Sequence, residues 1–169
     1  MIGQRNKKER QTLIIGFGSE ILTDDGIALK IVKDLKLNLD NNLFDFREVN
    51  LISLETLNLL IDYKNIVFID AVKNKTESLG EVNYYRLNNF NNSLHLFNSH
   101  DLTLQQLIEL GRIFSAELTE DIQVVTININ EFEEFGYELS NSMKSVYPNI
   151  YEQIFNLVKY CENILELKE

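Results

Sequence analysis

The sequence predicts an α/β fold in which a mostly parallel β-sheet carries helices on both faces. Two apolar runs rich in β-branched residues, TLIIGF at residues 12–17 and NIVFIDAV at residues 65–72, have the pattern of strands buried on both faces. Amphipathic helical segments alternate with such runs, which is typical of parallel strands joined by right-handed crossovers. No linker or repeat divides the chain, so we expect one α/β domain over residues 12–169 after a flexible polar leader, residues 1–11.

Each element is predicted from its local pattern. The strands are expected, in chain order, at residues 12–17, 43–49, 65–72, 80–87 and 121–129, the fourth at an antiparallel edge of the sheet. The helices are expected over residues 23–36 and 54–61, from about Asp101, and from Met143 toward the C-terminus. Ser99 is the expected N-cap of the third helix, and Pro148 is expected to mark the first turn of the last helix or a kink in it.

The composition excludes several classes of partner. A formal net charge of −10 argues against broad binding to nucleic acid or to an anionic membrane, because both need basic surface. The N-terminal residues lack the apolar core of a signal peptide, and no apolar run reaches transmembrane length. The single cysteine, Cys161, excludes an intrachain disulfide. We therefore expect a cytoplasmic protein without nucleic-acid or membrane partners.

A glycine-rich turn follows the first predicted strand and admits two interpretations. Gly16 and Gly18 suggest the phosphate-binding turn of dinucleotide-binding domains. However, Ile21 stands where that fingerprint has its third glycine, and the carboxylates of Asp24 and Asp25 would repel a phosphate. Acidic residues at this turn favour a cation, and nucleotide binding is kept as an alternative.

Three residues form a candidate metal site at the carboxyl edge of the predicted sheet, where ligands of parallel sheets bind. Asp25 follows the first strand, Asp70 lies near the end of the third, and His100, one of two histidines, precedes a predicted helix. Two carboxylates and an imidazole that leave coordination positions open suit a borderline divalent ion such as nickel or zinc. Taken singly, each residue also has a structural explanation: a charge at a helix N-terminus, a turn residue and a solvated histidine.

Four segments carry recognisable motifs in a fixed order along the chain. They are LIIGFGSEILTDDG from Leu13, IVFIDAV from Ile66, NSHDLTLQQLI from Asn98 and LSNSMKSVYPNIYEQI from Leu139. Together they resemble the hydrogenase maturation proteases, endopeptidases that process the large subunit of nickel–iron hydrogenases. That family has a buried strand, Gly-x-Gly-Asn and a pair of acids, then an aspartate at a second strand end, then Ser-x-His-x-Leu before a helix.

The resemblance implies a three-layer α/β/α fold with a mostly parallel, twisted five-stranded sheet of phosphorylase/hydrolase-like type. It implies that Asp25, Asp70 and His100 bind a metal ion and are the catalytic residues. The implied reaction is hydrolysis of one peptide bond, which releases a C-terminal extension from the precursor of a nickel–iron hydrogenase large subunit. The precursor is the expected partner. Nickel would arrive with this substrate, and zinc or cadmium could take its place in a crystal.

The resemblance also suggests substrate or turn roles for further residues: Gly16, Gly18, Ser19, Asp24, Gly26 and Asn50. Ser19 stands where the family usually has asparagine, and its hydroxyl can keep a turn role. The loop at residues 48–52 contains no glycine where many members carry an Asp-Gly-Gly-Thr-like sequence, so we expect a different substrate surface there. A non-catalytic relative that binds a metal or a partner protein is a second alternative.

Overall fold

The computed structural model describes the chain except for residues 1–11, 62, 88–102, 115–117, 131–134 and 167–169, and it describes side chains as far as Tyr160. The predicted leader, the expected cap Ser99 and the expected ligand His100 therefore lie outside the described residues.

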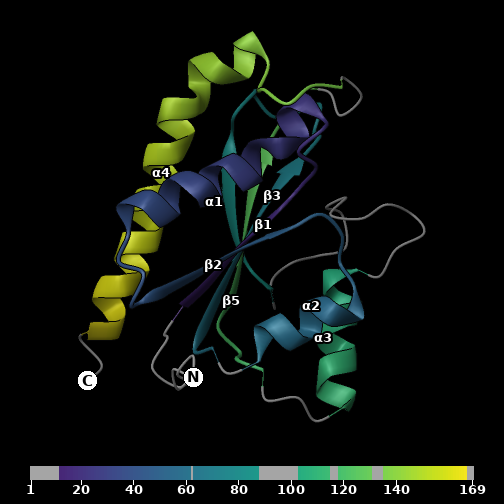
Figure 1. The fold of residues 1–169 in the computed structure, drawn as a ribbon, viewed down its shortest axis with the longest axis vertical. Coiled ribbons are helices and arrows are strands. Elements are labelled where there is room, and N and C mark those ends of the chain that lie inside the picture. Colours follow the sequence, from purple (N-terminus) through teal and green to yellow (C-terminus); the bar gives the residue numbers. More distant parts are fainter. Residues whose placement is uncertain (1–11, 62, 88–102, 115–117, 131–134, 167–169) are drawn as a thin grey trace, which may run out of the picture.

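The described residues form a five-stranded sheet in the order β2-β1-β3-β5-β4 (Figure 1). The strands are β1 Thr12–Phe17, β2 Phe44–Val49, β3 Asn65–Val72, β4 Val82–Arg86 and β5 Ile122–Asn128. All pairs are parallel except β4 with β5, which is antiparallel at the edge. The mostly parallel sheet and its antiparallel edge strand are thus confirmed, with boundaries that differ from the sequence prediction by at most two residues.

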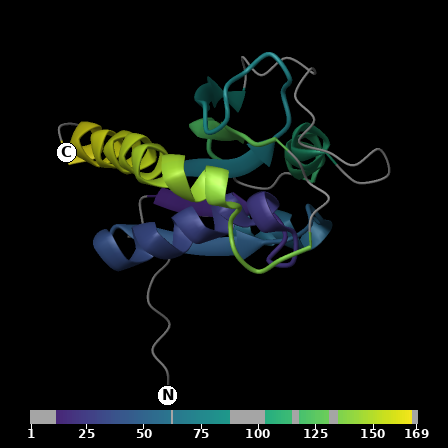
Figure 2. The same ribbon diagram turned by 90° about the horizontal axis from the view of Figure 1, so that it is seen from above.

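Within the described part of the chain, two helices cover each face of the sheet. They are α1 Ile27–Asn38, α2 Leu54–Leu60, α3 Leu104–Ile113 and α4 Asn141–Glu166. The apolar faces of α1 and α4 form one core with the sheet, and those of α2 and α3 form the other, so the predicted three layers are confirmed (Figure 1; Figure 2). None of these described helices is long and apolar enough to cross a bilayer.

β1 shows why the sheet is buried on both sides. Side chains alternate along a strand, so Ile14 joins the core under α1 and α4, whereas Leu13 and Ile15 join the core under α2 and α3. Gly16 lets α1 approach the strand closely, because a Cβ atom there would lie 2.8 Å from the carbonyl oxygen of Ala28. This glycine is therefore explained by helix packing without any bound phosphate.

The start of α3 differs from the sequence prediction. Thr103, and not Ser99, is its N-cap: the Thr103 hydroxyl accepts from the Gln106 backbone N–H at 3.1 Å, and the Gln106 side chain accepts from the Thr103 N–H at 2.9 Å. This reciprocal capping box satisfies two backbone donors at once, which favours a start at Leu104 over one near Asp101.

The start of α4 also differs. The helix begins at Asn141, so Pro148 lies in its interior; this excludes the first-turn alternative and leaves the kink as a prediction. Ser140 stands just before the helix, and its hydroxyl accepts from the backbone N–H of Met143 at 3.1 Å. This cap begins the helix two residues before Met143, the predicted start.

A short 3₁₀ turn before α1, η2 (Thr23–Gly26), is tied to the start of α4 by one buried carboxylate. Asp24 is 5% exposed, and its carboxylate accepts from the backbone N–H of Ser140 at 2.8 Å and from the Ser140 hydroxyl at 2.7 Å. The two residues are 116 positions apart in the chain. Asp24 therefore has a structural role, which joins two distant segments at one edge of the sheet.

We expect Asp24→Ala to destabilise the protein by about 2–3 kcal/mol, because it removes two hydrogen bonds to a buried carboxylate. In a chain of this size that loss lowers Tm by roughly 5–10 °C, which circular dichroism would measure. Ser140→Ala keeps the backbone N–H but also removes the cap on the Met143 N–H, so it should cost a similar amount. The double variant should cost less than the sum of the two losses, because both changes remove the hydrogen bond between the Ser140 hydroxyl and Asp24. Fully additive losses would contradict this account.

Candidate functional site

Asp25 and Asp70 meet at the carboxyl edge of the sheet. Asp25 lies in η2, shortly after β1 ends at Phe17, and Asp70 lies two residues before the end of β3. β1 and β3 are parallel neighbours, so their carboxyl ends lie side by side. The neighbours of Asp70 in β3, Ile69 and Ala71, face the core under α1 and α4. The Asp70 side chain therefore projects on the face that α2 and α3 cover.

The turn after β1 holds the Asp25 carboxylate in place. The backbone N–H of Ser19 donates to Asp25 Oδ2 at 2.7 Å. Gly18 has φ +153°, and a Cβ atom there would lie 2.2 Å from the backbone carbonyl oxygen of Asp25, so only glycine fits. The Ser19 hydroxyl accepts from the Ile21 N–H at 3.4 Å, which agrees with the turn role expected for this serine.

Among the described residues, no counter-charge offsets the negative charge of this pair. Burial raises the pKa of the Asp70 carboxyl well above its usual value, the charge of Asp25 raises it further, and the Ala71 N–H partly opposes both effects. Burial also raises the pKa of Asp25, against the hydrogen bond from Ser19. No described cationic side chain acts on either pKa. Two carboxylates that repel each other in a partly desolvated site fit a divalent cation.

The other predicted site residues lie around this pair in mixed roles. Gly26 faces the same turn, since a Cβ atom there would lie 3.1 Å from the Ser19 carbonyl oxygen. Asn50 is exposed, one residue beyond the end of β2. The backbone of this neighbouring turn is joined to the first one by a hydrogen bond of 3.3 Å from the Gly18 N–H to the Val49 carbonyl.

The third expected ligand, His100, is outside the described residues. Among the residues that are described, no group of three or more histidine, cysteine, aspartate or glutamate side chains gathers as a metal site. The structure thus brings two of the three predicted ligands together. The described chain resumes at Thr103, three residues after His100.

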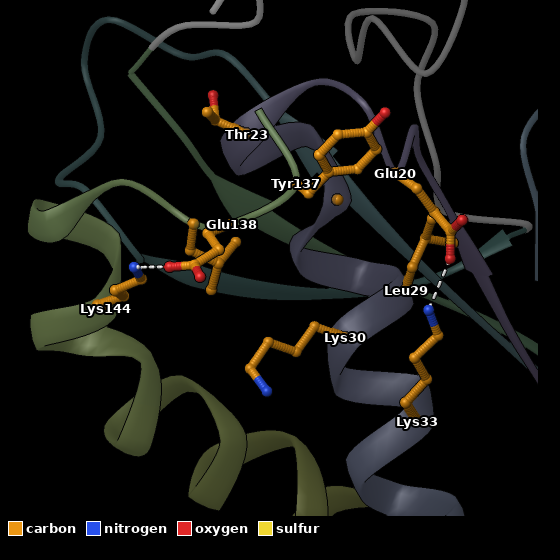
Figure 3. Close-up of a pocket in the computed structure, with 10 residues that line it drawn as sticks. Glu20, Thr23, Leu29, Lys30, Lys33, Tyr137, Glu138 and Lys144 are labelled. Carbon is orange, nitrogen blue, oxygen red and sulfur yellow. Dashed lines mark hydrogen bonds and ion pairs between the residues drawn. The ribbon is translucent and has the colours of Figure 1, made fainter. Parts of the chain in front are cut away.

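A groove of about 550 Å³ opens beside η2, between α1, the start of α4 and the segment that precedes α4 (Figure 3). Thr23 and Gly26 contribute to its wall and flank the acidic pair of the turn. Three lysines line it: Lys30, Lys33 and Lys144. Lys33 pairs with Glu20 at 2.6 Å, and Lys144 pairs with Glu138.

Exposed apolar side chains continue this groove toward the carboxyl edge. Tyr137, which lines the groove, is 88% exposed, Phe135 is 82% exposed, and Ile21 is 50% exposed. Phe135 and Ile21 belong to one small antiparallel contact, in which the Gly136 N–H donates to the Ile21 carbonyl at 3.0 Å. The sequence analysis did not single out Tyr137 or Ile21, although the aromatic residues of FGYE, at residues 135–138, are a usable signal for such a surface.

Comparisons with known proteins agree with this architecture. A family model described as hydrogenase maturation protease matches residues 30–157, a segment that contains Asp70 and His100 and begins after Asp25. No curated protein sequence matches.

Solved structures of similar fold include two maturation proteases. The hydrogenase maturating endopeptidase HybD of E. coli superposes with a TM-score of 0.69 at 18% identity, over 89% of this chain and 93% of that one. The NiFe hydrogenase maturation protease HycI of Thermococcus kodakarensis KOD1 gives a TM-score of 0.66 at 16% identity, over 88% and 92%. At such identities these likenesses support the fold alone. The family model spans well over half of the sequence, and it therefore establishes the family. The chain belongs to the hydrogenase maturation protease family.

Proposed function

We propose that this protease cleaves the C-terminal extension from a hydrogenase large-subunit precursor at a metal centre formed by Asp25, Asp70 and His100. Proteases of this family act on nickel-containing hydrogenase precursors. The observation that carries the metal centre is the partly desolvated pair of carboxylates, whose mutual repulsion no described cation relieves. We further propose that the ion is nickel delivered by the precursor, and that the reaction takes place in the cytoplasm.

The chain path supports His100 as the third ligand. β5 begins at the amino edge of the sheet, so α3, which precedes it, runs from the carboxyl edge toward the amino edge. α3 also covers the face on which Asp70 projects. His100 precedes the N-cap of α3 by three residues, and three residues span at most about 11 Å. The short reach of this connection supports the proposal that His100 is the third ligand.

The proposed chemistry assigns a role to each side chain. Asp25, held by the Ser19 N–H, and Asp70 would bind the ion as carboxylates, and His100 would bind it as neutral imidazole. Together they would place the scissile bond beside the metal. A metal ion in such an open site polarises a carbonyl group and lowers the pKa of a bound water.

The groove beside η2 is the proposed docking surface for the flexible segment of the precursor that carries the scissile bond. Its volume, about 550 Å³, fits a short peptide rather than a folded domain. Its apolar rim offers contact area, and its three lysines offer positive charge on a chain of net charge −10, beside Glu20 and Glu138 of the same lining. All three lysines are already ion-paired: Lys30 with Asp34, Lys33 with Glu20 and Glu48, and Lys144 with Glu138. These pairs are largely exposed and worth only about 0–1 kcal/mol each, so an acidic peptide would compete with them at small cost.

We expect Asp25→Asn, Asp70→Asn and His100→Ala each to lower precursor cleavage by more than about a hundredfold, because each removes a proposed ligand of the ion that activates the bond. Intact mass of a nickel-loaded precursor, measured over time, would report cleavage. His95→Ala is the matched control, since it removes the other histidine of the chain and should cleave normally. Normal cleavage by Asp70→Asn or His100→Ala would disprove the site, and an unchanged precursor mass with wild-type protein would leave only a binding role.

The raised pKa values predict how stability depends on pH in the metal-free protein. The folded state binds protons at Asp25 and Asp70 more tightly than the unfolded state, so their contribution to the free energy of unfolding falls as pH rises from about 4 through the raised values. Urea unfolding should show a smaller loss between pH 4.5 and pH 7.5 in Asp70→Asn than in wild type. Zinc should restore stability at pH 7.5 in wild type and not in Asp70→Asn. Equal pH dependence in both proteins would contradict the prediction.

The docking surface predicts an effect on KM without an effect on kcat. Tyr137→Ala and Lys144→Glu should each raise KM for the precursor about five- to tenfold, a loss of about 1–1.4 kcal/mol of binding, because neither residue touches the carboxylate pair. Tyr160→Ala and Lys159→Glu are matched controls, since these exposed residues lie far along α4. A KM for Tyr137→Ala and Lys144→Glu equal to that of the two controls would show that the substrate docks elsewhere.

A further inference from the structure

Three polar side chains form one row across the carboxyl half of the sheet. Asp70 of β3 is in register with Thr126 of β5, and Thr126 is in register with Asn83 of β4. Residues in register on neighbouring strands point to the same face, at a strand spacing of about 4.8 Å. The row therefore runs from the proposed metal ligand to the edge strand, on the face that α2 and α3 cover.

Two members of this row are buried polar side chains that make no hydrogen bond of normal geometry. Thr126 is 1% exposed, and its hydroxyl makes no hydrogen bond of normal geometry. The Nδ2 atom of Asn83 is likewise buried and without a hydrogen bond. An unsatisfied buried donor costs about 1–3 kcal/mol, so two in adjacent positions call for an explanation.

The nearest acceptor along the row is the Asp70 carboxylate. We propose that Asn83 and Thr126 form a hydrogen-bond relay to Asp70, in which Asn83 Nδ2–H donates to the Thr126 hydroxyl oxygen and the Thr126 O–H donates to the Asp70 carboxylate. With Asp70 as a metal ligand, a rotation about χ1 of Thr126 would close the relay. Thr126 is then a positioning residue, since ligating carboxylates are themselves held by hydrogen bonds. The inference rests on the proposed metal centre.

Tyr85 is the competing acceptor. It lies two residues from Asn83 on β4, on the same face. Burial raises the pKa of the Tyr85 hydroxyl, the charges of Glu77 and Glu81 raise it further, and Thr126 lowers it. The Thr126 hydroxyl therefore lies near Tyr85 in this structure, whereas its place beside Asp70 follows from the strand register. Tyr85→Phe distinguishes Tyr85 from Asp70 as the partner of Thr126, because it removes the tyrosine hydroxyl and leaves Asp70, Thr126 and Asn83 unchanged.

The test is zinc binding to the full-length protein, measured by isothermal titration calorimetry. Thr126→Val should weaken zinc binding about ten- to a hundredfold, as loss of a hydrogen bond to a metal ligand does, and Thr126→Ser should restore it. Asn83→Ala should weaken it less, and should have no further effect in the Thr126→Val background, because Asn83 acts through Thr126. Tyr85→Phe should bind zinc normally.

Thr12→Val is the matched control. Thr12 is also 1% exposed with an unsatisfied hydroxyl, but it begins β1 at the opposite, amino edge of the sheet. Both valine variants should fold at least as stably as wild type, since each removes an unsatisfied buried polar group. Only Thr126→Val should lose zinc affinity, so a purely structural role for this threonine is distinguishable from a positioning role.

The outcomes separate this inference from the metal centre itself. Zinc binding that survives Asp70→Asn would overturn the metal centre. Zinc binding that is lost in Asp70→Asn but equal in Thr126→Val and Thr12→Val would overturn the relay alone. A spectroscopic readout is independent of affinity: the Asn83 side-chain amide resonances should move when zinc is added to wild type and stay in place in Thr126→Val. Movement in both proteins would also overturn the relay.

Discussion

The site depends on one electrostatic constraint, which is that two carboxylates are held close together in a partly desolvated place without a described cation. Asp25 raises the pKa of Asp70 in addition to the effect of burial. A fold does not keep such a pair by default, because the repulsion favours an opened turn. Three contacts therefore hold the η2 turn. The Ser19 N–H donates to the Asp25 carboxylate, Gly18 lies close to the Asp25 backbone, and the Asp24 carboxylate accepts from Ser140.

Asp24 and Asp25 are chemically identical neighbours with opposite roles. In a 3₁₀ turn, successive side chains point about 120° apart, since three residues complete a turn. One carboxylate therefore faces Ser140 and the start of α4, where its hydrogen bonds are satisfied. The other faces the ends of β1 and β3. The first aspartate fixes the turn, and this leaves the second free to be placed against Asp70 at an electrostatic cost.

The sheet was predictable from the sequence because its strands are apolar on both faces, as in TLIIGF and NIVFIDAV. The two carboxylates were predictable for a related reason, since the carboxyl ends of parallel strands share one edge. The start of α3 was not predictable, because serine and threonine are both good N-caps. Only the reciprocal hydrogen bonds between Thr103 and Gln106 decide in favour of Thr103 over Ser99.

The groove and the polar row could not be predicted because they depend on contacts between distant segments. Tyr137 lines the groove only because the segment before α4 is joined to η2, through Asp24 and through the hydrogen bond from Gly136 to Ile21. Likewise, nothing in the sequence says that Thr126 stands between Asp70 and Asn83. That order requires the strand register, and a shift of one residue would place Val125 there and turn Thr126 to the other face.

The two halves of the proposed site lie on different sides of the sheet, which constrains the substrate. Asp70 and the polar row face α2 and α3, whereas the groove lies against α1 and α4, with η2 between them. A single peptide that reaches the carboxylates and the groove must cross the carboxyl edge over η2, past the exposed Ile21 and Phe135. An extended segment suits that path, because the groove has the size of a short peptide and η2 lies between the groove and the Asp70 face of the sheet. A terminal extension has this freedom, so the geometry agrees with a protease that removes the end of a protein rather than one that cuts within a folded domain.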